Sequence, residues 1–414
     1  MQHIRTAFDS TWSSLAPIGR DPATGGYRRF AWTPADLELR AWFGAQAQAR
    51  GLAVENDRNG NQWAWWGTPA DGAVVTGSHL DSVPGGGAFD GPLGVVGAFL
   101  ALDDLIARGV RPHRPLAIVN FVDEEGARFG IACAGSRLLT GALDADRARA
   151  LRDEDGTTLA EAMGAAGLDP RWIGRDPEAE RRIGVFVELH IEQGRHLAVL
   201  DRSVGVASSI RPHGRWRFCF RGEGNHAGTT LIADRRDPML PFADAVLAAR
   251  RAAVDSGVPD AVATFGRVRV DPNGTNAIPV RVDAWLDARA DRAGTVEAIV
   301  AAISRAGDAA AAEHGVAFEV ERESWTPVVD FDLTLRDRLA LVLAGAPVLA
   351  TGAGHDAGIL AATVPTAMIF ARNPTGISHS PQEQTSEDDC VAGIAALSTT
   401  LENLLTEPLQ VSAR

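Results

Sequence analysis

The chain has 414 residues, of which 45% are hydrophobic and 22% charged, a length and composition typical of a globular protein with two or three domains. All 40 residues in the combined Lys and Arg count are Arg. This excludes chemistry that needs a lysine amine, such as a Schiff base to pyridoxal phosphate or a Gly-Lys-Ser/Thr phosphate loop. The formal net charge of −13 argues against a nucleic-acid or membrane partner, because both surfaces attract clustered positive charge.

Cysteine usage and the N-terminal stretch bear on the compartment. The three cysteines are Cys133, Cys219 and Cys390; they are far apart in apolar settings, so we expect reduced core residues and no disulfide framework. The stretch Met1–Arg20 lacks the apolar run of a signal peptide, and nowhere do 18 apolar residues follow one another. We therefore expect a cytoplasmic protein.

The first half of the chain predicts a parallel sheet. Ala73–Ser78 is a short apolar run, Pro92–Gly109 has the length and periodicity of a buried helix, and Pro115–Val122 is a second apolar run. Strand, crossover helix and strand form a βαβ unit, the building block of an α/β domain with a mostly parallel sheet. Further strands are expected at Ile183–Leu189 and Val364–Phe370, and a closing helix at Gln384–Leu405.

Between these strands the pattern changes to alternation. In Arg215–Arg221 the aromatic residues occupy one face and the arginines the other, as in a half-exposed strand. The following elements are expected to be a helix at Asp237–Gly257, strands at Ala261–Asp271 and Ala277–Ala288, a helix at Thr295–His314 and a strand at Val316–Ser324. The order β-α-β-β-α-β is the ferredoxin-like motif.

These elements predict an α/β fold, with a mostly parallel-sheet catalytic domain and an inserted ferredoxin-like α+β domain. We place the catalytic domain at residues 1–207 and 326–414, and the inserted domain at residues 208–325.

A polar, glycine-rich segment follows the first predicted strand, from Gly77 to Gly91. A phosphate-binding loop is one interpretation, but Asp81 and Asp90 flank the glycines and no Lys is present. His79, directly after the strand, suits a metal-bound imidazole that Asp81 orients, and Asp90 can reach the same point. Taken alone, this His-x-Asp pattern is more typical of a surface turn.

Similar residues follow other predicted strands. Asp123, Glu124 and Glu125 end one buried run, His190 lies at the end of another, and His379 follows the last apolar strand. Ligands bind at the carboxyl ends of strands in open α/β sheets, and buried carboxylates need a cationic partner. Histidines and carboxylates at the ends of several strands therefore favour N/O coordination of zinc or a similar divalent ion.

Seven segments together resemble one enzyme family. They are HLDSVPGGGAFDG, FVDEEGARFG, ELHIEQG, GNHAGTT, the N-x-I-P of Asn276–Pro279, GAGHDAG and GISHSPQE. In order, over about residues 60–390, they are similar to the dinuclear-metal amidohydrolases that include N-carbamoyl-L-amino-acid hydrolase, allantoate amidohydrolase and β-ureidopropionase. This is the carbamoylase branch of the aminoacylase and carboxypeptidase type of metallopeptidase.

The resemblance implies a metal site with two divalent ions per subunit. It implies that Asp90 bridges the ions, that His79 and His190 complete one site, and that Glu125 and His379 complete the other. Zinc is the expected metal, although such ligands also admit manganese, cobalt or nickel.

The resemblance also implies the catalytic and substrate-binding residues. It makes Glu124 the general base for a metal-bound water, with Asp81 orienting His79. His226 would stabilise the oxyanion in the partner subunit's site. Expected substrate-binding residues are Gln193, Asn276, Arg289 and His355, with Arg289 and Asn276 holding the carboxylate. Without the resemblance, His226 would be an ordinary turn residue and Arg289 a member of a surface ion pair.

The expected activity is metal-dependent hydrolysis of a linear amide by a homodimer, from an N-carbamoyl-L-amino acid to the L-amino acid, CO2 and NH3. Allantoate is the alternative substrate, followed by those of β-ureidopropionase and of an aminoacylase or peptidase. A dinuclear phosphoesterase and a non-enzymatic binding protein are further interpretations that the resemblance disfavours. The conformation of the loop Leu231–Asp234 stays open, because it departs from the Pro-Met that relatives usually have there. The choice of base and ligand among the three acidic residues also stays open, because strand alternation would put Asp123 and Glu125 on one face.

Overall fold

A computed structural model describes residues 2–407 of the chain. Its internal contacts divide the chain into two compact units: Met1–Ser209 with Asp330–Arg414, and Ile210–Val329. We call these the catalytic unit and the inserted unit; the boundaries expected from the sequence are 208 and 325. Within residues 2–407, none of the helices combines the length and the apolar character needed to cross a membrane.

A nine-stranded sheet forms the centre of the catalytic unit, in the order β1-β2-β4-β3-β5-β15-β6-β13, with β14 paired to β6. Its four central strands, β4, β3, β5 and β15, are mutually parallel, whereas β1, β2 and β6 join antiparallel. The central strands are β3 (Ala73–His79), β4 (Leu116–Phe121), β5 (Ile183–Ile191) and β15 (Thr366–Ala371). The other strands are β1 (Ala53–Asn56), β2 (Gln62–Trp66), β6 (Val204–Ile210), β13 (Val329–Asp330) and β14 (Val348–Thr351).

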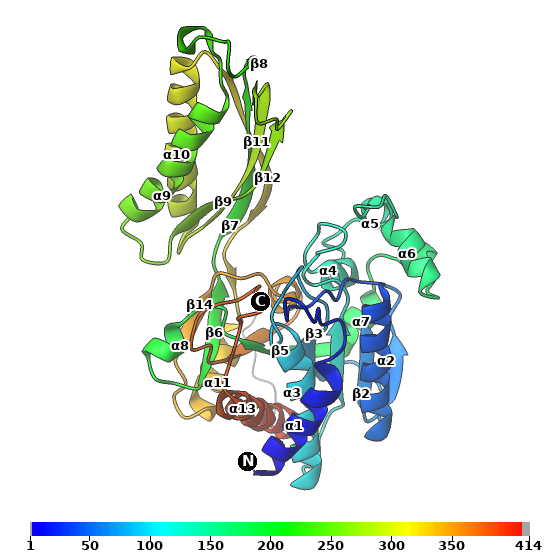
Figure 1. Cartoon of the computed structure of the whole chain (residues 1–414). Helices are drawn as coiled ribbons and strands as arrows, with labels where there is room; N and C mark the ends of the chain where they lie inside the picture. Colours follow the sequence, from blue (N-terminus) through cyan, green and yellow to red (C-terminus); the bar gives the residue numbers. More distant parts are fainter. Residues whose placement is uncertain (1, 408–414) are drawn as a thin grey trace. The chain divides into compact units, whose positions relative to one another are not determined.

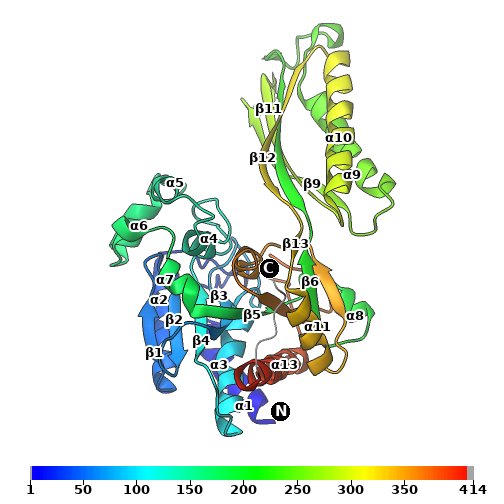
Figure 2. The ribbon, with the colours of Figure 1, turned by 180° about the vertical axis from the view of Figure 1, so that it is seen from behind.

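Three long helices bury one face of this sheet (Figure 1). They are α1 (Gln2–Leu15), α3 (Pro92–Ala107) and α13 (Glu387–Thr406). The helix α3 begins with Pro92 at its first turn and is buried on nearly all sides, because it packs both on the sheet and under α13. The neighbouring α11 (Leu333–Val342) lies beside α13 (Figure 2).

Further helices, of which α2 is as long as α3, complete the catalytic unit. They are α2 (Pro34–Ala49), α4 (Ala134–Thr140), α5 (Ala145–Ala150), α6 (Leu159–Ala165), α7 (Pro177–Arg182), α8 (His196–Val199) and α12 (Asp356–Leu360). The predicted βαβ unit is present as β3-α3-β4, with both strands fully buried, so the parallel α/β expectation is confirmed.

The inserted unit is a four-stranded antiparallel sheet with two helices on one face (Figures 1 and 2). Its strands are β7 (His213–Arg221), β9 (Val262–Asp271), β11 (Arg281–Arg289) and β12 (Ala317–Thr326), in the order β12-β7-β11-β9. Its helices are α9 (Met239–Asp255) and α10 (Ala293–Glu313). This order of the β-α-β-β-α-β elements confirms the ferredoxin-like expectation. The aromatic face of β7, formed by Trp216, Phe218 and Phe220, is buried under the helices as expected.

One predicted strand is interrupted. Residues 277–288 were expected to form a single strand, but Ala277–Ile278 forms β10, which pairs with β8 (Asn225–His226), and β11 begins only at Arg281. Pro279 lies between the two, and proline has no N–H for the sheet ladder. The interruption places the Asn276 segment beside His226 instead of on the four-stranded sheet.

Candidate metal centre

The carboxyl ends of three neighbouring parallel strands converge on one point of the catalytic unit. His79 is the last residue of β3, and the register places it beside Phe121, the last residue of β4. Glu124 and Glu125 therefore follow immediately next to His79. On the other side of β3, His190 lies in β5. These ends of the strands bring imidazoles and carboxylates together, as expected for an open α/β sheet.

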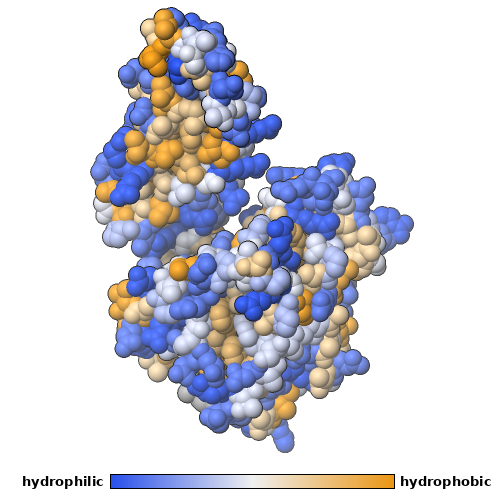
Figure 3. Space-filling view, in the orientation of Figure 1, coloured by the Kyte–Doolittle hydropathy of each residue, from blue (hydrophilic) through white to orange (hydrophobic). Residues whose placement is uncertain are grey.

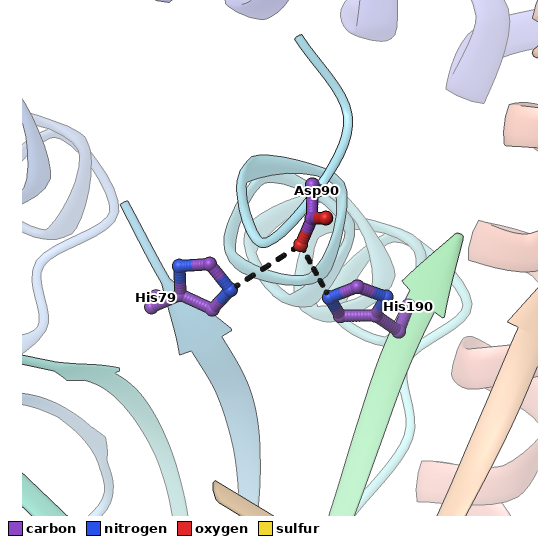
Figure 4. A group of neighbouring side chains, drawn as sticks. All are labelled: His79, Asp90 and His190. Carbon is purple, nitrogen blue, oxygen red and sulfur yellow. Dashed lines mark ion pairs between the residues drawn. The ribbon is translucent and has the colours of Figure 1, made fainter. Parts of the chain in front are cut away.

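Asp90 lies at the centre of this group, just before α3. Its Oδ1 atom is 3.2 Å from Nε2 of His190 and 3.7 Å from Nε2 of His79 (Figure 4). Its Oδ2 atom is 3.4 Å from Nε2 of His379. The two oxygens of one carboxylate thus face two different sets of ligands, which is the arrangement that a bridging carboxylate needs.

The donor atoms form two groups that share Asp90. His79, Asp90 and His190 form one, and Asp90, Glu125 and His379 the other, with the atoms of each group within 4.8 Å of one another. Glu188, His190 and His355 form a third group of the same dimensions.

The donor set fits divalent cations. The Nε2 atoms of His79 and His190 are buried and make no hydrogen bond in the described part of the chain. Both atoms point toward Asp90 (Figure 4), and buried polar atoms are normally satisfied. Imidazole and carboxylate ligands are those of zinc and related divalent ions.

Charges within the cluster shift its protonation. Burial opposes ionisation of Asp90, but the ion-pair contacts with His190, His379 and His79 outweigh it and hold the pKa of Asp90 well below its usual range. The hydrogen bond with Asp90 raises the pKa of His379 to about 9. Burial, with the nearby charge of Asp90, raises the pKa of Glu125 to about 7. His379 and Glu125 therefore carry protons where a cation would bind, and binding of a cation would release these protons.

Asp81 holds the cluster together through more contacts than the sequence predicts. Its Oδ1 atom lies 3.4 Å from Nδ1 of His79, which fits the expected orienting role. Its two oxygens also accept the backbone N–H groups of Glu124 at 3.1 Å and Glu125 at 3.0 Å. One buried carboxylate thus fixes both the first histidine and the turn that carries the two glutamates.

The three acidic residues after β4 point to different places. Strand alternation does not apply to them, because β4 ends at Phe121 and Asp123 has φ of +53°. Glu124 Oε2 lies 3.7 Å from Nε2 of His79, and Glu125 Oε2 lies 3.5 Å from Nε2 of His379. Asp123 is buried, and its two carboxylate oxygens make no hydrogen bond within residues 2–407. The geometry therefore separates the two glutamates from Asp123, which the sequence pattern alone could not do.

Other expected residues surround this centre. Gln193 donates from Nε2 to Oδ2 of Asp90 at 2.7 Å, and the ring of His355 lies 4.5 Å from that of His190 between centroids. Burial keeps the pKa of His355 well below its ordinary value, so its imidazole is neutral.

Two contacts in this centre were not expected from the sequence. Cys133, expected only as a core residue, places Sγ 3.3 Å from Oε1 of Glu124. Oγ of Ser378 lies 3.1 Å from Oδ2 of Asp90. In the sequence, only its position directly before His379 in the motif indicated that Ser378 lies in this centre. All three cysteines are buried free thiols, as expected.

The expected residues of the inserted unit lie at its two opposite ends. His226 and Asn276 are neighbours, because Ala277 pairs with His226 and the N–H of Ala227 donates to the carbonyl of Asn276 at 2.9 Å. Arg289 ends β11, eight residues after Arg281, which is about 27 Å along an extended strand. Asn276 and Arg289 of one chain therefore lie at opposite ends of the inserted unit, and their shared role in holding a substrate carboxylate stays a prediction.

Arg289 is engaged within the inserted unit. Its Nε and Nη2 atoms donate to the two oxygens of Asp287 at 2.7 and 3.0 Å, and Nε of Arg215 lies 3.6 Å from the same carboxylate. This bidentate contact fixes the plane of the guanidinium group.

The chain is similar to known proteins over nearly its whole length. The sequence model described as peptidase family M20/M25/M40 matches residues 75–403. An N-carbamoyl-L-amino acid amidohydrolase of Geobacillus stearothermophilus is 37% identical over 94% of this chain and 96% of its own length. An allantoate amidohydrolase of Escherichia coli strain K12 is 34% identical over 97% of this chain and 98% of its own. The crystal structure of an amidase of the hydantoinase/carbamoylase family from Burkholderia vietnamiensis superposes with a TM-score of 0.88 at 31% identity, covering 98% of both chains.

Proposed function

The chain belongs to peptidase family M20/M25/M40 and is an amidohydrolase of its carbamoylase and allantoate branch, and from this premise we propose a substrate and a mechanism. The substrate is an N-carbamoyl-L-amino acid, whose ureido group is hydrolysed to release the L-amino acid, CO2 and NH3. The observation that carries the mechanism is the shared Asp90, whose two oxygens face two separate sets of ligands.

We assign two divalent ions to these sets, zinc being the best match to the donors. His79 and His190 would hold one ion, Glu125 and His379 the other, and Asp90 both. When bound, such ions polarise the carbonyl oxygen of the substrate and lower the pKa of water. A ureido carbonyl is a poor electrophile, so this assistance is what makes its hydrolysis feasible near neutral pH.

Glu124 is the general base. It removes a proton from the attacking water while the new C–O bond forms at the ureido carbon, and it then delivers that proton to the leaving nitrogen as one C–N bond breaks. The carbamic acid left by this cleavage decomposes to CO2 and frees the second nitrogen. Burial, against the opposing charge of His79, raises the pKa of Glu124 well above its ordinary value. A cation bound beside it would oppose this shift, so Glu124 would begin as the carboxylate and could still hold the proton between the two steps. The thiol of Cys133 beside Oε1 limits the orientations open to it.

The inserted unit provides substrate recognition from two chains. His226 and Asn276 lie at one end of the unit and Arg289 at the other, a separation larger than a small ureido acid. A homodimer resolves this difficulty, because one site can receive His226 and Asn276 from one chain and Arg289 from another. Arg289 would hold the substrate carboxylate with its planar fork, whose plane Asp287 already fixes.

The surface of the inserted unit is compatible with a homodimer. Exposed apolar side chains gather over its helical layer (Figure 3), and on α9 they include Leu240, Leu247 and Val254, the last 69% exposed. Apolar side chains that cluster on a surface are typical of protein contacts.

Release of ammonia from a panel of substrates tests the proposal. The panel contains N-carbamoyl-L-amino acids, their D-enantiomers, N-carbamoyl-β-alanine and allantoate, each with metal-reconstituted protein. We expect the highest kcat/KM with an N-carbamoyl-L-amino acid. A clear preference for allantoate would transfer the assignment to the alternative, and no hydrolysis of any ureido acid would refute it.

A further inference from the structure

Two loops that are far apart in the sequence carry Asp90 and His379, and one buried carboxylate joins them. Glu383 is 5% exposed. Its Oε1 atom accepts the backbone N–H groups of Phe89 at 2.9 Å and of Asp90 at 3.1 Å. Its Oε2 atom lies 3.1 Å from Oγ of Ser378, whose one proton it shares with Oδ2 of Asp90 at the same distance. Glu383 is thus bonded to the backbone of one ligand and to the residue directly before another.

We propose that Glu383 is a positioning residue that sets the separation of Asp90 and His379 and thereby the affinity for the second of the two ions. This inference rests on the proposed function, because it takes Asp90 and His379 as ligands of that ion. Glu383 belongs to none of the three groups of candidate ligands; it acts through the two loops.

The contacts of Glu383 favour an effect on the second ion over the first. Asp90 serves both ions, but the other ligands of the first ion, His79 and His190, lie on strands of the sheet. The ladder pairs His79 with Phe121 and His190 with Phe370, and thus fixes both histidines without help from Glu383. His379 lies in an irregular segment between β15 and α13 and has φ of +55°. Its place beside Asp90 therefore depends on side-chain contacts that bridge the two loops. Those contacts come from Glu383 and Ser378, and from Gln193 between Asp90 and His379.

Gly87 shows how closely the two loops approach each other. A Cβ atom at Gly87 would lie 2.4 Å from Oε1 of Glu383 and 2.5 Å from its Cβ and Cδ atoms. Any larger residue at this position must push Glu383 away from the N–H groups of Phe89 and Asp90. Gly87→Ala thus displaces the Glu383 carboxylate while keeping it in the chain.

Zinc titration of chelated full-length protein, by calorimetry and metal content, tests the inference. The wild type is expected to bind two ions. Glu383→Ala should retain one near wild-type affinity and bind the other about 10–100-fold more weakly, the usual effect of losing a residue that supports a ligand. Glu383→Gln keeps an oxygen acceptor for the two N–H groups and should restore the second affinity to within about 3-fold. Cobalt absorption should show the same selective loss in Glu383→Ala.

Asp104→Ala is the matched control, because Asp104 is a buried carboxylate that bonds Ser398 and Arg108 at the far end of α3. It should lower the Tm and leave both zinc affinities unchanged; an equal loss in this control would overturn the inference. If Glu383→Ala does not fold, Gly87→Ala should show the same selective loss. The inference would also be overturned if Glu383→Ala bound both ions with wild-type affinity. If Glu383→Ala does not fold, the same result in Gly87→Ala would overturn the inference. A wild type that binds no metal would instead refute the proposed function.

Discussion

Gly91, the residue between Asp90 and α3, allows a direct test of how the first histidine is held. Its φ is +85°, and a Cβ atom there would lie 2.4 Å from Cε1 of His79 and 2.6 Å from both ring nitrogens. Carbon atoms in contact are normally about 3.5–4.0 Å apart. Gly91→Ala must therefore displace the imidazole of His79 by about 1 Å.

Two separable effects set how much stability and how much metal affinity Gly91→Ala should lose. A side chain at positive φ costs about 1–2 kcal/mol of folding stability, and this cost alone is expected for Gly51→Ala. Gly51 has φ of +69°, and a Cβ atom there would meet nothing within 4 Å. Gly91→Ala adds the displacement of a ligand. A poorly oriented ligand weakens metal binding by about 10–100-fold, which corresponds to about 1.4–2.7 kcal/mol.

Two measurements on both variants separate these effects. Urea unfolding of the chelated proteins should show a loss of stability in each. Zinc titration should show weakened binding in Gly91→Ala and unchanged binding in Gly51→Ala. If both variants bind zinc with the wild-type affinity, His79 is not a ligand held in the geometry described, and the reasoning fails.

Three further results are expected. Glu124→Gln should keep its bound metal but lose about 10²–10⁴-fold in kcat, and near-normal turnover of a metal-loaded variant would remove Glu124 from the role of base. Arg289→Ala should raise KM for carboxylate-bearing substrates with little change in kcat, and Asp287→Asn should raise it less; an unchanged KM in steady-state kinetics would exclude Arg289 from the site. Zinc affinity should rise with pH, because zinc displaces protons from His379 below pH 9 and from Glu125 below pH 7. Calorimetry in buffers of different ionisation enthalpy should therefore show more protons released at pH 6 than at pH 8, and equal release would contradict these pKa shifts.

The parallel core and the positions of the ligands along the chain could be predicted from sequence because the signal is local. β3 and β4 are buried on both faces, so each is a continuous apolar run, and the polar residue that ends each run marks the edge of the sheet. The outer strands gave no such signal. In β1, three of the four residues are exposed, and β13 has only two residues.

The support of the ligands could not be predicted, because it depends on contacts between distant segments. Asp81 meets the N–H groups of Glu124 and Glu125 across 43 and 44 residues, and Glu383 meets Asp90 across 293. No periodicity or spacing reports such pairs. The pairing of the Asn276 segment with His226 likewise follows from the interruption of a strand at Pro279, which alternation in the sequence does not reveal.

The central claim is that two ions held around Asp90 are required to hydrolyse a ureido group. The most direct test is to follow ammonia release from an N-carbamoyl-L-amino acid while zinc is added stepwise to chelated protein of known metal content. The account predicts no turnover without metal and a rise in activity that is complete at two ions per chain. Hydrolysis that persists after all metal has been removed would contradict it.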